Sequence, residues 1–241
     1  PKAYYELLFW GGGHVLQFTW TLLMLVAWLW LAQAAGAPAP LTARTVVLLF
    51  GIGLASVFLT PVIYLAYDVG TVEHHRWHTW LMRFGGGLAI LPFMLALVLG
   101  LARARRPDGR EGALRAALLS SLVVFGVGGV IGVLIHGSNV KVPAHYHGSI
   151  VGVTLALMGL AYHLLPKFGY AEVRGRLAAC QLWLYAGGQL LHVLGLLWSG
   201  GYGVQRKVAG AAQALRSTEE IAAMGLMGLG GLVAVVGGMM F

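Results

Sequence analysis

The chain has 241 residues, of which 59% are hydrophobic and 10% are charged, and its formal net charge is +8. A soluble domain carries roughly 25% charged residues, so this composition excludes an ordinary water-soluble domain and indicates transmembrane helices in a lipid bilayer. The basic residues lie in short loops between apolar stretches, so membrane topology explains the positive charge and no nucleic-acid partner is expected.

Seven apolar segments are predicted, each long enough to cross a bilayer. In chain order they cover Tyr5–Ala35, Thr45–Asp68, His78–Ala104, Leu114–His136, Ala144–Leu165, Leu177–Ser199 and Glu220–Phe241. Turns rich in Gly, Pro and charged residues separate them, and no repeat of solenoid length is present. We therefore predict an all-α, polytopic helix bundle that forms a single transmembrane domain over residues 1–241.

Basic charge differs between alternate loops and predicts the orientation. The densest cluster lies in and next to the loop that joins the third and fourth segments, at Arg103, Arg105, Arg106, Arg110 and Arg115. Because cytoplasmic loops carry an excess of Lys and Arg, we assign this loop to the cytoplasm and the N-terminus to the outer side. The chain begins at Pro1 and not at Met, and we expect it to be a fragment or one half of a split subunit.

The first segment contains a histidine directly after three glycines, His14 in WGGGHVLQF. Glycines at these positions allow a haem face or another helix to come close. Ionisable residues at membrane depth are costly and usually functional, and histidine is the commonest metal ligand. On its own, however, a single histidine on an apolar helix is more often a hydrogen-bonded core residue.

The second histidine feature is an adjacent pair, His74 and His75 in VEHHRWH, just past the second segment. At a frayed helix end, two neighbouring imidazoles can both turn toward one ion. Together with His14 they would form a three-imidazole site, a ligand set suited to copper, zinc or iron.

The fifth segment begins with AHYHG, which places His145 and His147 two residues apart. On an α-helix such residues point about 200° apart, so they cannot easily bind one metal. They can bind two separate irons on opposite faces of the helix, an arrangement that suits two haems. The alternative is a pair of histidines that are hydrogen-bonded at a helix start.

Taken in order, these motifs resemble the catalytic subunit of the haem–copper oxidase superfamily. WGGGH at 10–14 is similar to the sixth-helix motif whose histidine binds the non-haem metal, and His74–His75 fall where the family has its paired metal ligands. The stretch 128–148 resembles the ninth helix to the start of the tenth, and 191–208 resembles the eleventh helix with its following basic pair. The seven segments would then correspond to helices six to twelve of that fold.

The resemblance implies two haems and one non-haem metal. His145 would be the axial ligand of the high-spin haem and His147 one axial ligand of the low-spin haem. Arg206 and Lys207 would bind the haem propionates through charge-assisted hydrogen bonds. The non-haem metal would be held by His14 with the adjacent histidine pair, and copper is favoured over iron because the first segment lacks a ligating carboxylate.

The same resemblance implies partners and a location. The other low-spin haem ligand belongs to the family's second helix, so an N-terminal half with helices one to five must supply it, on this chain or another. A cytochrome c or a cupredoxin-like subunit is expected as electron donor. The expected location is a prokaryotic inner (cytoplasmic) membrane, as a multi-pass protein of a respiratory complex.

One departure from the family pattern bears on the reaction. Many oxygen reductases carry a tyrosine four residues after the sixth-helix histidine, where this chain has Phe18. The missing phenol favours reduction of nitric oxide to nitrous oxide, as in divergent reductases derived from oxidases. Gln17 lies one turn from His14 and is a candidate hydrogen-bond donor at the catalytic site, although a packing role fits it equally.

Two alternatives remain open. The first is a terminal oxygen reductase whose tyrosine comes from another helix; one oxidase branch uses a slot that falls on Asp68 here, next to Tyr67. The second is a non-catalytic haem subunit for electron transfer, which would leave His14 and the His74–His75 pair without a role.

Overall fold

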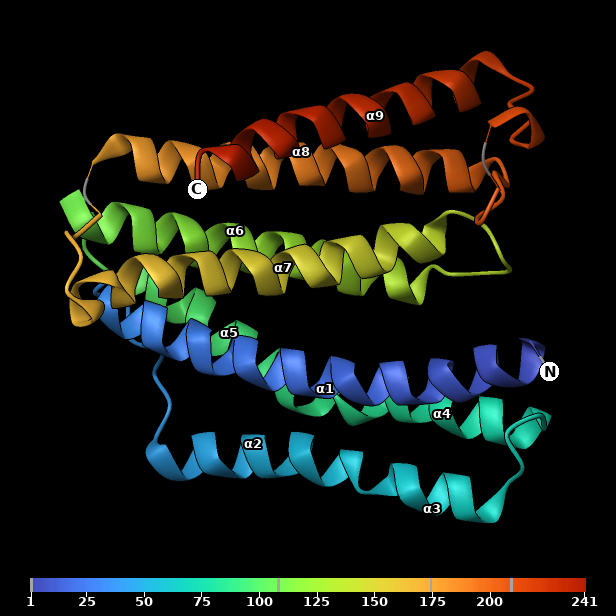
Figure 1. Ribbon diagram of the computed structural model, residues 1–241. Helices are drawn as coiled ribbons and strands as arrows, with labels where there is room; N and C mark the ends of the chain where they lie inside the picture. Colours follow the sequence, from blue (N-terminus) through green and yellow to red (C-terminus); the bar gives the residue numbers. More distant parts are fainter. Residues whose placement is uncertain (1, 108, 174, 209) are drawn as a thin grey trace. The chain divides into compact units, whose positions relative to one another are not determined.

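The computed structural model describes residues 2–107, 109–173, 175–208 and 210–241 (Figure 1). Described elements are α-helices and two 3₁₀ helices: α1 (Lys2–Ala34), α2 (Ala43–Val57), α3 (Leu59–Ala66), α4 (Val72–Gly85), α5 (Gly87–Arg103), α6 (Gly109–Val133), α7 (Lys141–Leu164), η1 (Leu165–Phe168), α8 (Arg176–Gly201), η2 (Gly210–Ala212) and α9 (Thr218–Met239). Within these residues the only β contact is an isolated bridge between Asn139 and Gln205.

Seven stretches of these helices are long and apolar enough to cross a membrane, which makes the chain an integral, multi-pass membrane protein. They cover Tyr4–Ala34, Ala43–Ala66, Val72–Arg103, Glu111–Val133, Lys141–Phe168, Arg176–Gly201 and Thr218–Met239. The predicted all-α, seven-span fold is therefore confirmed. The largest difference in the boundaries is at the third span, which begins at Val72 and not at His78.

Two of the spans are each broken into two helices. The second span breaks at Phe58, and Pro61 follows in the first turn of α3, where it has no N–H to continue the hydrogen bonds of α2. The third span breaks at Gly86, between α4 and α5. Next to this break, Ser56 donates a hydrogen bond from Oγ to the carbonyl of Gly85 at 3.0 Å.

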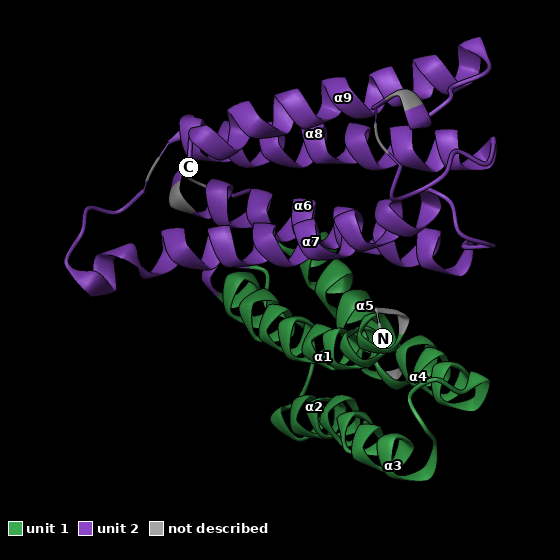
Figure 2. Cartoon of the chain, turned by 45° about the vertical axis from the view of Figure 1, so that its right-hand side comes forward, with its two compact units in different colours: residues 1–33, 37–105 green, residues 34–36, 106–241 purple. Residues whose placement is uncertain are grey.

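The chain divides into two compact units (Figure 2). Unit 1 consists of Pro1–Gln33 and Ala37–Arg105, and unit 2 of Ala34–Gly36 and Arg106–Phe241. Unit 1 thus contains α2 to α5 and nearly all of α1, and unit 2 contains α6 to α9. The histidines of interest divide accordingly, with those before residue 100 in unit 1 and those after residue 130 in unit 2.

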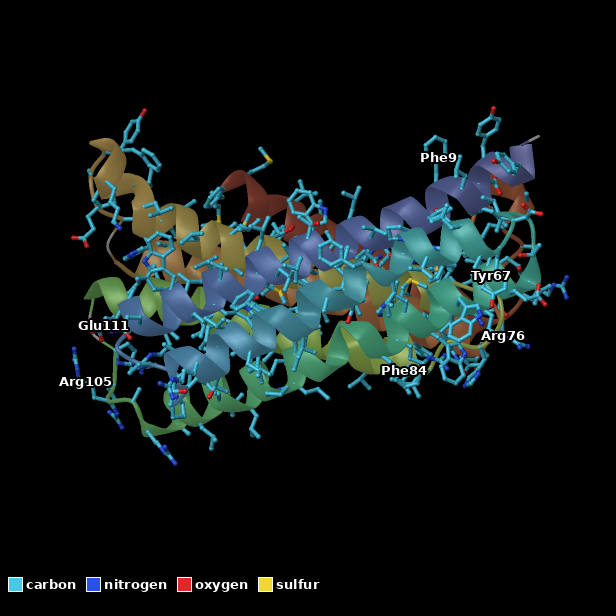
Figure 3. All side chains as sticks on the ribbon, turned by 90° about the horizontal axis from the view of Figure 1, so that it is seen from below. Phe9, Tyr67, Arg76, Phe84, Arg105 and Glu111 are labelled. Atoms are coloured by element: carbon cyan, nitrogen blue, oxygen red, sulfur yellow. The ribbon has the colours of Figure 1, made fainter. Side chains whose placement is uncertain are left out.

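Within unit 1, the two ends of the helices differ in chemistry. Figure 3 shows Tyr67 and Arg76 at one end of this unit and Arg105 at the other. The start of α4, with its histidines, therefore lies at the end away from the Arg-rich segment that follows α5. This is the arrangement expected when the two ends of a membrane-spanning helix face opposite sides of the bilayer.

Within unit 2, α6 and α7 cross by direct backbone contact. A Cβ atom at Gly128 would lie 2.6 Å from the amide nitrogen of Ser149, and one at Gly148 would lie 2.7 Å from the Cα of Gly128. Only glycine at both positions allows this approach. One core cluster of this unit joins the end of α6, the start of α7 and the end of α8. It consists of Ile131, Val140, Ala144, Val193, Leu196 and Val204.

Candidate functional site

The adjacent histidines lie in the regular first turn of α4. Thr71 is the N-cap: its Oγ accepts a hydrogen bond from the amide of His74 at 3.3 Å, and its carbonyl accepts one from the amide of His75 at 3.3 Å. Thr71 Oγ in turn donates to the carbonyl of Asp68 at 2.7 Å. The pair lies past the second span, as expected, but the helix start that carries it is a capped turn and not a frayed end.

Because the helix is regular there, the two neighbouring imidazoles face different partners. His74 is only 1% exposed, and its ring centroid lies 4.3 Å from that of His78 and 4.8 Å from that of Tyr64. His75 is exposed, and its ring lies 4.3 Å from the indole of Trp10 on α1.

His14 reaches the same indole from its own helix. Its Nδ1 donates a hydrogen bond to the carbonyl of Trp10, and its ring centroid lies 4.5 Å from that of Trp10. The structure thus brings His14 and His75 together on Trp10, while His74 lies with His78. Gln17, one turn beyond His14 on α1, is exposed. Among the described residues, no three His, Cys, Asp or Glu side chains form a ready metal-binding group.

The donor chemistry around α4 nevertheless fits a metal. The Nε2 atoms of His74 and His78 are both buried, and neither has a hydrogen-bond partner. Buried polar atoms almost always have a partner, and an imidazole lone pair without one is suited to a metal cation. His78, to which the sequence analysis gives no role, joins His74 in this buried pair. The signal was its spacing of four from His74, which places two histidines on one helix face.

The aromatic residues near these histidines have distinct roles. Phe18 packs in a core cluster with Ile63 and Leu81. The hydroxyl of Tyr67 accepts a hydrogen bond from the indole N–H of Trp77 at 3.1 Å. Tyr64, which the sequence analysis did not single out, lies edge-on to His74 and His78 and donates its hydroxyl to the carbonyl of Leu8 at 3.1 Å.

In unit 2, His145 is held against α6. Its Nδ1 donates to the carbonyl of Gly128 at 2.7 Å, so the lone pair is on Nε2. Its ring lies over Gly132, where a Cβ atom would be 2.7 Å from His145 Nδ1. A hydrogen bond from the far ring nitrogen to a carbonyl is the usual support of a metal-bound histidine, so this arrangement fits an axial haem ligand.

His147 faces a different helix. Its ring stacks on that of His192 of α8, with centroids 4.9 Å apart and planes 17° apart. The Nδ1 of His192 donates to the carbonyl of Met227 of α9 at 3.0 Å. His145 therefore faces α6 and His147 faces α8, as their separation of about 200° on one helix predicts.

The predicted propionate-binding residues follow α8, in a loop that is tied to the start of α7. The amide of Val140 donates to the carbonyl of Val204 at 3.0 Å, next to the isolated bridge. Arg206 donates from Nε to Ser138 Oγ at 3.1 Å. Lys207 is exposed and has a positive φ of 61°. Both cations thus lie in the loop that borders the helix start carrying His145.

Comparisons with known proteins agree with these features. The family model of cytochrome c and quinol oxidase polypeptide I matches residues 2–239. The chain is 31% identical, over its full length, to an uncharacterized protein of Rickettsia prowazekii (strain Madrid E), of which it covers 54%. It is 28% identical, over 72% of its length, to an uncharacterized protein of Aquifex aeolicus (strain VF5), of which it covers 42%. The chain thus spans about half the length of these relatives. No solved structure matches it.

Proposed function

Because the chain belongs to the family of cytochrome c and quinol oxidase polypeptide I, we propose that it is the part of a respiratory membrane oxidoreductase that holds two haems and one non-haem metal. His145 is the axial ligand of the high-spin haem and His147 one ligand of the low-spin haem. The hydrogen bond from His145 to Gly128 and the stack of His147 on His192 support these roles.

The remaining site residues divide between the non-haem metal and the haem propionates. His14, His74 and His75 are the proposed ligands of the metal, which is copper in preference to iron. The unpartnered Nε2 of His74 and the contact of His14 and His75 with one indole support this assignment. Arg206 and Lys207 bind the propionates, and the hydrogen bond from Arg206 to Ser138 orients its guanidinium.

We propose nitric oxide as the substrate: two NO, two electrons and two protons give N₂O and water. The observation that carries this choice is Phe18, which stands where many oxygen reductases have a tyrosine and packs into the apolar core with Ile63 and Leu81. A phenyl ring delivers neither an electron nor a proton, and cleavage of an O–O bond needs both. Coupling of two NO molecules needs neither from a side chain.

The protein's own residues would contribute position and charge. When bound, the haem iron and the non-haem metal supply electrons and Lewis acidity. The imidazoles of His14 and His145 are oriented by hydrogen bonds from Nδ1 to main-chain carbonyls, which leaves Nε2 as the donor atom. Gln17, three residues after His14, is the proposed donor of a hydrogen bond to the reacting oxygen atoms. The apolar core around Phe18 would exclude bulk water from its side of the proposed metal site.

The proposal includes partners. An N-terminal half with helices one to five supplies the second ligand of the low-spin haem. A cytochrome c or cupredoxin-like subunit delivers electrons. The relatives are about twice as long as this chain, which leaves room for such a half in the full protein. The membrane is proposed to be a prokaryotic inner membrane, in keeping with the bacterial origin of both relatives.

The decisive experiment is metal and haem analysis of the purified full protein, followed by turnover assays. We expect two haem signals, one high-spin and one low-spin, one non-haem metal per pair of haems, and one N₂O formed for every two NO consumed. Reduction of O₂ to water without formation of N₂O would replace nitric oxide by oxygen as the substrate. A protein with bis-histidine haem alone would be an electron-transfer subunit.

One observation favours oxygen reduction as the second candidate. Tyr64 places a phenol ring 4.8 Å from the ring of His74 and 5.0 Å from that of His78. Tyr67, next to the slot at Asp68, instead accepts a hydrogen bond at its hydroxyl from the indole N–H of Trp77. If Tyr64 serves as the redox-active phenol, Tyr64→Phe abolishes O₂ reduction. In a nitric oxide reductase the same variant keeps most of its N₂O production.

A further inference from the structure

A second buried histidine accompanies His74 on α4. His78 lies four residues further along and is also only 1% exposed. The two ring centroids are 4.3 Å apart. Both Nε2 atoms are shielded from solvent and lack a hydrogen-bond partner. Two unpartnered imidazole nitrogens side by side in an apolar setting are costly unless a cation binds their lone pairs.

The helical geometry places His78 between the two histidines that precede it. At about 100° per residue, His78 is rotated by about 40° from His74 and by about 60° from His75. It lies about 6 Å, slightly more than one helical turn, further along the axis than His74. A metal approached by both His74 and His75 would therefore have His78 directly beside it.

The surroundings of His78 hold its ring with Nε2 directed toward α1. Its Nδ1 donates to the carbonyl of His74 at 3.0 Å, so the lone pair is on Nε2. A Cβ atom at Gly11 would lie 3.3 Å from that Nε2 and would also run into the phenol of Tyr64. Glycine at this position therefore keeps open the space in front of the imidazole. The indole of Trp10, one residue before, lies 6.1 Å from the His78 ring.

We propose that His78 is a ligand of the non-haem metal and adds a fourth imidazole to His14, His74 and His75. The proposal rests on the proposed function, because it takes the metal from there. Its pairing with His74 at a spacing of four is the arrangement by which one helix face presents two imidazoles to one ion. The ligand set is then four neutral nitrogens, which suits copper or iron.

The test compares three variants of the full protein purified from its membrane: His78→Asn, His78→Cys and His136→Asn. His136 is an exposed histidine in the loop after α6, and its replacement controls for general effects on expression. We expect His78→Asn to lower the occupancy of the non-haem metal roughly 10- to 100-fold at limiting metal, with both haem signals retained. His136→Asn should keep the metal.

His78→Cys reports on the position itself. The natural chain has a single cysteine, Cys180, which is exposed on α8 in unit 2. A thiolate at residue 78 would add a sulfur atom at about 2.3 Å from the metal, visible by X-ray absorption at the metal edge. This measurement decides the question even if His78→Asn fails to accumulate.

The outcomes separate the two proposals. Full metal occupancy in His78→Asn, or metal without a sulfur neighbour in His78→Cys, overturns the role of His78 and leaves the proposed function standing. Wild-type protein that holds neither haem iron nor a non-haem metal overturns both. Loss of metal in His78→Asn together with a sulfur neighbour in His78→Cys establishes the fourth ligand.

Discussion

Four histidines share one feature of hydrogen bonding. In His14, His78, His145 and His192, Nδ1 donates to a main-chain carbonyl. This fixes the tautomer and puts the lone pair on Nε2, the atom farther from the helix backbone. Such support of the far ring nitrogen typically tunes the affinity for a metal by one to two orders of magnitude, so it is a direct target for mutation.

Gly132 offers the most specific test of this support. In Gly132→Ala, the new Cβ would lie 2.7 Å from His145 Nδ1, so the ring has to move and its bond to Gly128 is lost. We expect the high-spin haem to bind roughly 10- to 100-fold more weakly. Haem content and the optical spectrum of the CO-bound reduced protein measure this.

The control for that variant is the neighbouring Gly129→Ala, whose Cβ would meet nothing within 4 Å. It should bind both haems like the wild type. Equal high-spin haem in the two alanine variants would show that the contact with His145 has no bearing on haem binding.

His192 gives a second prediction, directed at the other haem. Its ring stacks on that of His147, the proposed ligand of the low-spin haem, so His192→Ala removes the surface on which that ring rests. We expect an altered EPR signal of the low-spin haem and unchanged CO binding at the high-spin haem. His192→Phe keeps an aromatic ring, so its low-spin EPR signal should be closer to that of the wild type. An identical low-spin signal in His192→Ala would refute a positioning role.

At the scale of single elements, hydropathy was sufficient for the spans but not for their breaks. Every predicted segment overlaps a span of the structure, since about 20 apolar residues are needed to cross a bilayer. The hydropathy pattern does not show the breaks at Phe58 and Gly86, although Pro61 and three consecutive glycines at 85–87 are helix-breaking residues. The breaks depend on local backbone geometry around Pro61 and on the contact of Gly85 with Ser56.

The same difference applies to the candidate site. The predicted start of the third span, His78, lies after the observed start at Val72 because charged residues and histidines at 73–78 interrupt the apolar run, although Thr71 is a recognisable N-cap. The spacing of His78 from His74 was also present in the sequence. The contact of His14 and His75 with Trp10 is tertiary, and no local pattern predicts it.

Helix pairing in unit 2 yields a prediction of stability. In Gly195→Ala, the new Cβ on α8 would lie 2.5 Å from the amide nitrogen of Met227 and 2.7 Å from the carbonyl oxygen of Ala223. Backbone atoms of α9 cannot move aside as a side chain can. We therefore expect the free energy of unfolding to fall by about 1–3 kcal/mol. A thermal unfolding scan in detergent measures it.

Gly187→Ala on the same helix is the matched control, because its Cβ would meet nothing within 4 Å. Its midpoint of unfolding should equal or exceed that of the wild type, since alanine has the higher helix propensity. If Gly195→Ala unfolds at the same temperature as this control, the close contact between α8 and α9 does not contribute to stability.

At the scale of the whole molecule, basic charge predicts the orientation in the membrane. We expect the Arg-rich segment around residue 105 in the cytoplasm and the loop around residue 214 outside. In a Cys180→Ser background, Ala214→Cys should react with a membrane-impermeant thiol reagent in spheroplasts. Arg105→Cys should react only after the membrane is opened. The reverse pattern of labelling would show that the chain has the opposite orientation in the membrane.

Helix α7 carries His145 and His147 with one residue between them, and its contact with α6 at Gly128 and Gly148 is made of main-chain atoms alone. Main-chain atoms have no rotamers to exchange, so the separation of α6 and α7 at this crossing does not change with side-chain rotamers. His145 and His147 lie on one helix with a single residue between them, so movements of other helices leave the spacing of their backbone atoms unchanged. If both histidines bind haem iron as proposed, the rate of electron transfer between the two haems should depend little on movements of the helices around α7.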